Sequence, residues 1–173
     1  MKTTTRDKQA TIDLNGLAGK YLTFVLGGAE YGIAVRRVRE IIKVLPITPV
    51  PQSPPAVKGV INLRGKVIPV VDLSLKFGVT SAPQTDRTCI VVVEVMVRSA
   101  ALPIGVIVDA VSDVTPIGAD ALEPPPDFGD HRGGRYIKAL AKHEGGVKVL
   151  LDLDDVLAES AESPRPATSP VPV

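Results

Sequence analysis

The stretch with the most suggestive chemistry is 59–73, GVINLRGKVIPVVDL, in which a Gly-Lys pair precedes a hydrophobic run that ends in Asp72. A phosphate-binding loop shares these elements, but it places four residues between its first glycine and the Gly-Lys pair and a hydroxyl residue after the lysine. Here five residues separate Gly59 from Gly65, and Val67 stands at the hydroxyl position. The spacing therefore argues against a nucleotide site.

The run after the Gly-Lys pair, VIPVV, is β-branched and contains a proline, so it favours a strand over a helix. We predict a strand, a tight turn and a second strand, with Gly65 supplying the turn conformation. Arg64 and Lys66 would then project from the turn into solvent, and the open question is why an arginine is displayed there.

Other catalytic or metal-binding patterns are missing from the sequence. One cysteine, Cys89, and two distant histidines, His131 and His143, cannot form a zinc-ligand cluster. The chain has no Gly-x-Ser-x-Gly elbow and no HExxH motif. We expect no cofactor, no metal and no enzymatic activity, and we favour a binding module. A small β-barrel enzyme or ligand-binding protein with an unrecognised cleft stays open as an alternative.

Composition favours an all-β protein. Of 173 residues, 45% are hydrophobic, none is Trp, and 15 Gly and 16 Pro provide many turns between β-branched runs. The formal net charge of +1 and the few aromatic residues predict no nucleic-acid partner. The N-terminal segment is polar, and the apolar runs are about one strand long. We therefore expect no direct membrane insertion and a cytoplasmic location.

Along the chain we predict a flexible leader (1–19), one domain (20–158) and a disordered Pro/Ser-rich tail (159–173). Helical signals are short: VRRVREII (35–42) has apolar residues at a helical spacing, PPAVKG suits a brief turn, and LDDVLAES suits a closing helix. Strand signals dominate, in KYLTFVL, EYGIAV, GVINL, VIPVVDL, TCIVVVEVMV, LPIGVIVD, YIKAL and VKVLL.

An internal repeat divides the domain. Residues 56–73 align without gaps on 136–153, and 32–41 resemble 105–114 in the same order. We infer two similar β-subdomains, roughly 20–83 and 84–158. Asp72 and Asp152 match at the ends of equivalent strands, which favours capping over chemistry. Glu144 stands where the first copy has Arg64, so the fold itself does not demand a cation at that turn.

The ordered series EYGIAVRRVREI, VKGVINLRGKVIPVVDLSLKFG, IGVIVDAVSDV and LEPPPDF resembles the CheW-like domain family of chemotaxis coupling proteins, over nearly the whole chain from about 20 to 158. The resemblance implies two five-stranded, SH3-like β-barrel subdomains around a shared hydrophobic core, with short helical turns and interlaced subdomains. The chain departs from the family pattern in two ways: Ala139 and Ala141 stand where glycines are frequent, and the Pro-rich tail is not part of the family core.

The resemblance also implies a function. The expected role is a non-catalytic adaptor that couples the cytoplasmic tip of methyl-accepting chemoreceptors to the regulatory domain of a CheA-type histidine kinase, recruited to membrane-associated arrays. The alternative is a scaffold for a non-flagellar chemosensory pathway, such as one that controls pili. The residues that the resemblance assigns to partner binding are Val38, Glu40, Gly59, Asn62, Arg64, Gly105 and Val114.

Overall fold

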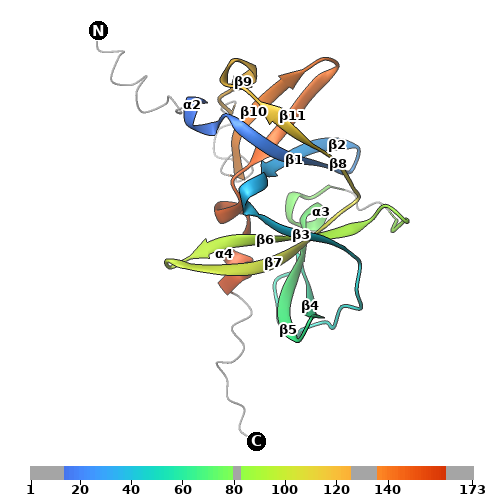
Figure 1. Cartoon of the computed structure of the whole chain (residues 1–173). Helices are drawn as coiled ribbons and strands as arrows, with labels where there is room; N and C mark the ends of the chain where they lie inside the picture. Colours follow the sequence, from blue (N-terminus) through green and yellow to red (C-terminus); the bar gives the residue numbers. More distant parts are fainter. Residues whose placement is uncertain (1–13, 80–82, 126–135, 163–173) are drawn as a thin grey trace, which may run out of the picture.

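The computed structural model describes residues 14–79, 83–125 and 136–162, and these form two β-sheets with short helices (Figure 1). Sheet A has the strand order β8-β1-β2-β11-β10-β9, and sheet B has the order β3-β6-β7-β5-β4. The strands of sheet A are β1 (Gly19–Leu26), β2 (Ala29–Ala34), β8 (Ala110–Ile117), β9 (Leu122–Glu123), β10 (Ile137–His143) and β11 (Gly146–Leu151). Those of sheet B are β3 (Val38–Lys43), β4 (Val57–Leu63), β5 (Lys66–Asp72), β6 (Cys89–Val97) and β7 (Ala100–Val108).

The helical pieces are few and short, so the predicted all-β class is confirmed. They are α2 (Leu14–Leu17), η1 (Val35–Arg37), α3 (Leu73–Phe77), η2 (Ala119–Ala121) and α4 (Leu153–Glu162). The predicted closing helix is α4. Residues 1–13 of the expected leader and 163–173 of the expected tail lie outside the described residues, while α2 falls within the leader range and α4 runs into the tail range.

The helix expected over 35–42 is wrong. Only the three-residue turn η1 is helical, and strand β3 begins at Val38. Along β3 the exposure alternates with a period of two, because one face of the strand packs inward while the other meets solvent. Val38 and Ile42 lie on the less exposed face.

The predicted strand–turn–strand over 59–73 is confirmed. Strands β4 and β5 pair antiparallel, with Leu63 opposite Lys66. Arg64 (φ 53°) and Gly65 (φ 88°) both adopt left-handed backbone conformations. Positive φ at both central residues is the requirement of the two-residue hairpin turn whose twist matches that of the flanking strands.

The internal repeat appears in the topology. The aligned segments are β4–β5 and β10–β11, and the second matching pair is β2–β3 and β7–β8. The two sheets have the same strand order once each strand is replaced by its equivalent in the other repeat: β8-β1-β2-β11-β10 in sheet A corresponds to β3-β6-β7-β5-β4 in sheet B. Only the two-residue edge strand β9 has no counterpart among the described strands of sheet B. In each sheet one parallel contact joins the repeats: β11 pairs with β2, and β5 pairs with β7.

Each sheet also mixes the two halves of the chain. Strands β1 and β2, from the segment 20–83, join β8 to β11, from 84–158. Strands β3, β4 and β5 join β6 and β7 in the same way. A cut at residue 83 therefore does not separate the two sheets.

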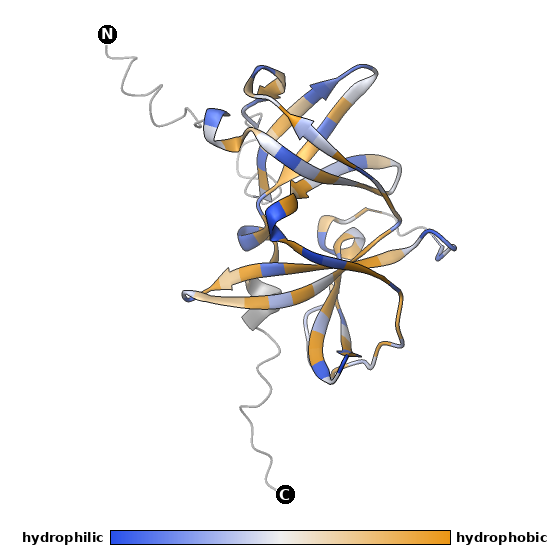
Figure 2. Ribbon diagram, viewed as in Figure 1, coloured by the Kyte–Doolittle hydropathy of each residue, from blue (hydrophilic) through white to orange (hydrophobic). Residues whose placement is uncertain are grey.

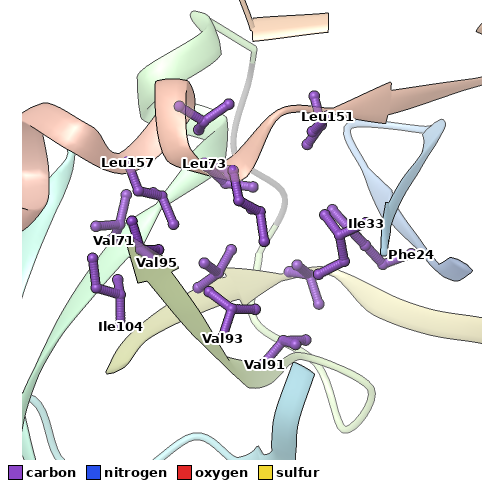
Figure 3. Close-up of a cluster of buried hydrophobic side chains, with 14 of the residues drawn as sticks. Phe24, Ile33, Val71, Leu73, Val91, Val93, Val95, Ile104, Leu151 and Leu157 are labelled. Atoms are coloured by element: carbon purple, nitrogen blue, oxygen red, sulfur yellow. The ribbon is translucent and has the colours of Figure 1, made fainter. Parts of the chain in front are cut away.

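Three buried clusters follow from the alternation of side chains along the strands. On β6, Ile90 and Val92 belong to a cluster within sheet B, whereas Val91, Val93 and Val95 face the cluster shared by both sheets. The shared cluster includes residues of β1, β2, β5, β7 and β11 and the helix α4, as Figure 3 shows for Leu151 and Leu157. Figure 2 shows hydrophobic residues along the strands of both sheets and hydrophilic residues at many turns. The expected shared core is present.

Two strand edges are capped by side chains where regular pairing stops. Beyond the pairing of Val38 with Val93, the carbonyl of Glu94 accepts a hydrogen bond from Nε of Arg37 (3.1 Å), and the amide of Met96 donates to Oδ1 of Asp154 (2.9 Å). Arg37 and Asp154 also form an ion pair with each other.

The equivalent edge in sheet A is capped by one residue. The amide of Asp109 donates to the carbonyl of Val25 (3.0 Å), and its Oδ2 accepts from the amide of Gly27 (2.9 Å). The end of β1 is therefore capped by Asp109, which lies between β7 and β8, whereas the corresponding end of β6 is capped by residues of η1 and α4.

Candidate functional site

The most distinctive surface contact joins Glu40 on β3 to Arg64 in the β4–β5 turn. Nη2 of Arg64 donates to Oε2 of Glu40. The exposed fraction of the Arg64 side chain is 67%, and that of Glu40 is 32%. Most of the guanidinium therefore still faces solvent, and its remaining donors are accessible to a carboxylate or carbonyl from a partner.

Asn62 shapes the turn that carries Arg64. Its Oδ1 accepts a hydrogen bond of 2.8 Å from the amide of Gly65. This side-chain-to-backbone hydrogen bond satisfies the Gly65 amide inside the tight turn. Asn62 is exposed, but its amide oxygen is already engaged in holding Arg64 in position.

Strand β3 is an edge strand of sheet B and presents a mixed surface beside this ion pair. Val38 is half-buried and packs against the shared cluster. Ile41 points outward with 45% of its surface exposed. Arg39 contacts Glu94 at 3.4 Å on the adjacent strand. An exposed aliphatic group beside accessible charges is a combination found in protein interfaces.

Ile41 is not among the residues predicted for partner binding, although the internal repeat carries a signal for it. In the repeat, the position of Ile41 in 32–41 matches that of Val114 in 105–114. Val114 lies on β8, the edge strand of sheet A, and is 44% exposed. The two edge strands therefore expose an aliphatic residue at the same position of each repeat. Val114 lies on a different sheet from Glu40 and Arg64.

Gly59 and Gly105 are buried. A Cβ atom on Gly59, whose φ is 146°, would lie 2.1 Å from the carbonyl oxygen of Thr48. Thr48 bridges to Val60 through two backbone hydrogen bonds of 2.9 Å. A Cβ atom on Gly105 would lie 2.8 Å from Cγ2 of Ile90. Both glycines thus allow neighbouring residues to pack closely against their backbone. Their influence on partner binding would therefore be indirect, through the position of the strands that carry them.

Chemical groups elsewhere in the described residues offer little reactivity. Burial raises the pKa of the Cys89 thiol, which keeps it protonated and weakly nucleophilic. No group of three His, Cys, Asp or Glu side chains in the described ranges is arranged to hold a metal ion. No helix in the same ranges is long and apolar enough to cross a bilayer.

Comparison with known proteins identifies the class. The CheW-like domain model matches residues 20–161. The chemotaxis protein CheW of Rhizobium meliloti is 36% identical over 135 residues, which is 78% of this chain and 84% of that protein. The chemotaxis protein CheW of Bacillus subtilis is 32% identical over 148 residues, covering 85% and 92%.

A solved structure agrees. The crystal structure of the scaffolding protein TtCheW from Thermoanaerobacter tengcongensis superposes with a TM-score of 0.71 at 32% identity, covering 81% of this chain and 92% of that one. The protein therefore belongs to the CheW-like domain family, as the sequence resemblance predicted. Ala139 and Ala141, the first departure from the family pattern, are both buried in the cluster within sheet A, where their small side chains fit.

Proposed function

We propose that the protein is a non-catalytic adaptor in a chemosensory array. The observation that carries this proposal is the family match over 20–161, together with relatives named chemotaxis protein CheW and a similar structure titled a scaffolding protein. The partners proposed are the cytoplasmic tip of methyl-accepting chemoreceptors and the regulatory domain of a CheA-type histidine kinase. The adaptor would act in the cytoplasm and be recruited to membrane-associated receptor arrays.

The surface proposed for the receptor tip consists of β3 and the β4–β5 turn. Glu40 and Arg64 supply charges, and Ile41 supplies exposed aliphatic area. An exposed ion pair contributes at most about 1 kcal/mol to folding, so exchanging Glu40 for a partner's acceptor costs the fold little. The Arg64 side chain can therefore rotate toward a receptor carboxylate or carbonyl while the hairpin turn keeps its conformation, because Asn62 stabilises that turn independently of Glu40.

The remaining residues of the expected set support this surface indirectly. Val38 anchors β3 on the shared core, and Gly59 allows the segment after β3 to cross β4 closely. Gly105 and Val114 lie on strands β7 and β8. Val114, at the repeat position of Ile41, is the group proposed for a second contact.

The proposal is tested by co-sedimentation with receptor signalling fragments and the kinase. The wild-type protein is expected to join a ternary complex and to raise the amount of kinase that sediments with receptor. Failure to sediment with either partner would contradict the adaptor role. The motility of a deletion strain, scored separately for swimming and for pilus-driven movement, distinguishes a flagellar output from the non-flagellar alternative.

A further inference from the structure

A cavity of about 460 Å³ lies where helix α2, turn η1 and the start of α4 meet strands β10 and β11. The partly exposed Leu17 and Ile137 form the accessible part of its apolar wall, while Leu151 and Leu153 border it with side chains that are almost fully buried in the shared cluster. A smaller hollow of about 140 Å³ shares part of this lining, and Lys138 borders both spaces. The cavity therefore combines apolar walls with an ammonium group. It is distinct from the surface formed by β3 and the β4–β5 turn.

Lys138 has no carboxylate within ion-pair distance among the described residues. Its half-buried ammonium lies 5.8 Å from the centroid of the Tyr21 ring, which is a cation–π contact. Burial lowers the pKa of Lys138, and Arg36 adds to that effect by repulsion. A half-buried cation of this kind gains stability when an anion joins it.

The two carboxylates near Lys138, those of Asp152 and Asp154, form hydrogen bonds or ion pairs with other groups. Asp154 holds the guanidinium of Arg37 and the amide of Met96. Asp152 accepts a hydrogen bond of 3.3 Å from the amide of Asp155 in the first turn of α4. Neither carboxylate therefore neutralises the ammonium directly, although both line the cavity and oppose the lowering of its pKa.

We propose that this cavity binds a monocarboxylate with a short apolar stem, and that Lys138 is its cationic contact. The carboxylate would pair with the ammonium, and the stem would lie against Leu17 and Ile137. Asp152 and Asp154 at the same site repel any anion, and they repel a dianion such as phosphate more strongly than a monocarboxylate. The carboxylate can belong to a free short-chain acid or to a glutamate side chain of a partner, because both present the same group.

The repeat supplies a matched control. Lys58 occupies the position in 56–73 that Lys138 occupies in 136–153, but Lys58 is exposed on β4. Loss of Lys58 removes the same charge from the corresponding strand of the other sheet without touching the cavity. Lys58→Gln and Lys138→Gln therefore separate a site effect from a general charge effect.

The test is an NMR titration of protein whose lysines carry ¹³C-methyl labels, using sodium pentanoate as the probe and neutral pentanamide as its uncharged counterpart. Pentanoate is expected to shift the Lys138 signal saturably and to raise its pKa, since a bound anion favours the ammonium. Pentanamide is expected to bind weaker by about tenfold or more. In Lys138→Gln, the backbone amide shifts of Leu151 and Leu153 on adding pentanoate should disappear, whereas Lys138→Arg and Lys58→Gln should retain them.

A second arm separates the sources of the carboxylate. A short capped peptide with one glutamate is compared with the same peptide carrying glutamine. A response to pentanoate supports a free acid, and a response to the glutamate peptide alone supports a partner side chain. The proposal is overturned if neither probe gives a saturable response at millimolar concentration. It is also overturned if folded Lys138→Gln responds like the wild type.

Discussion

Glu40 and Arg64 link the two opposite edges of sheet B. Glu40 lies on β3, the first strand in the sheet order, and Arg64 follows β4, the last. The backbone bridge between Thr48 and Val60 joins the same two edges, because Thr48 belongs to the segment after β3. A sheet whose edge strands meet in this way must be strongly curled, and the charged pair marks the place where the curl brings them together.

Replacing Arg64 with Ala should leave the fold intact and weaken receptor binding. The pair is exposed, so its loss should reduce the free energy of unfolding by at most about 1 kcal/mol. Loss of one charge-assisted contact should weaken the affinity for a receptor fragment by about 1.5–3 kcal/mol. Arg64→Glu should bind less well still, because it repels Glu40 and copies the charge of the second repeat.

A binding titration and a thermal melt measure the two effects. Arg87→Ala serves as the control, since Arg87 is an exposed arginine outside this surface. If both Arg64 variants bind like the wild type while folded, Arg64 is an ordinary solvated turn residue.

Gly59→Ala should destabilise the protein strongly. The added Cβ would lie 2.1 Å from the Thr48 carbonyl oxygen, at a backbone φ of 146° that side chains rarely adopt. We expect the free energy of unfolding in urea to fall by about 2–4 kcal/mol from combined strain and overpacking. The control is Gly146→Ala, whose nearest neighbour would be 3.7 Å away. Equal stability of both variants would show that the segment at Thr48 moves aside freely.

Asp154→Ala should loosen helix α4 from β6. The substitution removes the ion pair to Arg37 and the hydrogen bond from the Met96 amide. The expected loss is about 1–3 kcal/mol in the free energy of unfolding, and amide exchange at Met96 should become faster. Asp155→Ala, at the exposed neighbouring position, should change stability by less than about 1 kcal/mol. An unchanged exchange rate at Met96 in Asp154→Ala would contradict the capping role.

Cys89 should react slowly with iodoacetamide in the folded protein. The ordinary thiol pKa is 9.0, and burial raises it in the fold, so less thiolate is present than in the unfolded chain. The same shift predicts that stability falls as pH rises from the unfolded pKa toward the higher folded value, because the unfolded chain then releases the proton first. Labelling rates at matched pH with and without denaturant measure the first effect. Equal rates would show that the thiol is open to solvent.

Much of the fold could be predicted from local patterns. The β-branched runs predicted most of the strands, and the repeat aligned β4–β5 with β10–β11. A helix was predicted over strand β3 because Val35, Val38 and Ile42 suit a helical spacing, and the bulge between Val38 and Glu40 in the pairing with β6 is not visible in the sequence. Strand β8 was missed because an exposed edge strand carries polar residues and a proline.

The partners of the strands could not be predicted in the same way. A period of two shows which face of a strand is buried but not which strand lies beside it. The exchange of strands between the sheets therefore required the structure. The cavity at Lys138 was missed for a related reason, since its walls come from segments far apart in the sequence, α2, η1 and α4.

The interlaced strands also determine when the chain can fold during synthesis. The hairpin of β1 and β2 leaves the ribosome first, yet its neighbours on both sides, β8 and β11, are made much later. Sheet B has all its strands once Val108 has emerged, but the β6 edge lacks its carboxylate until Asp154 is added. Because the earliest and latest strands share one sheet, the native fold can form only after nearly the whole domain has been synthesised. Until then both edges of the nascent β1–β2 hairpin are unpaired and could pair with strands of other chains.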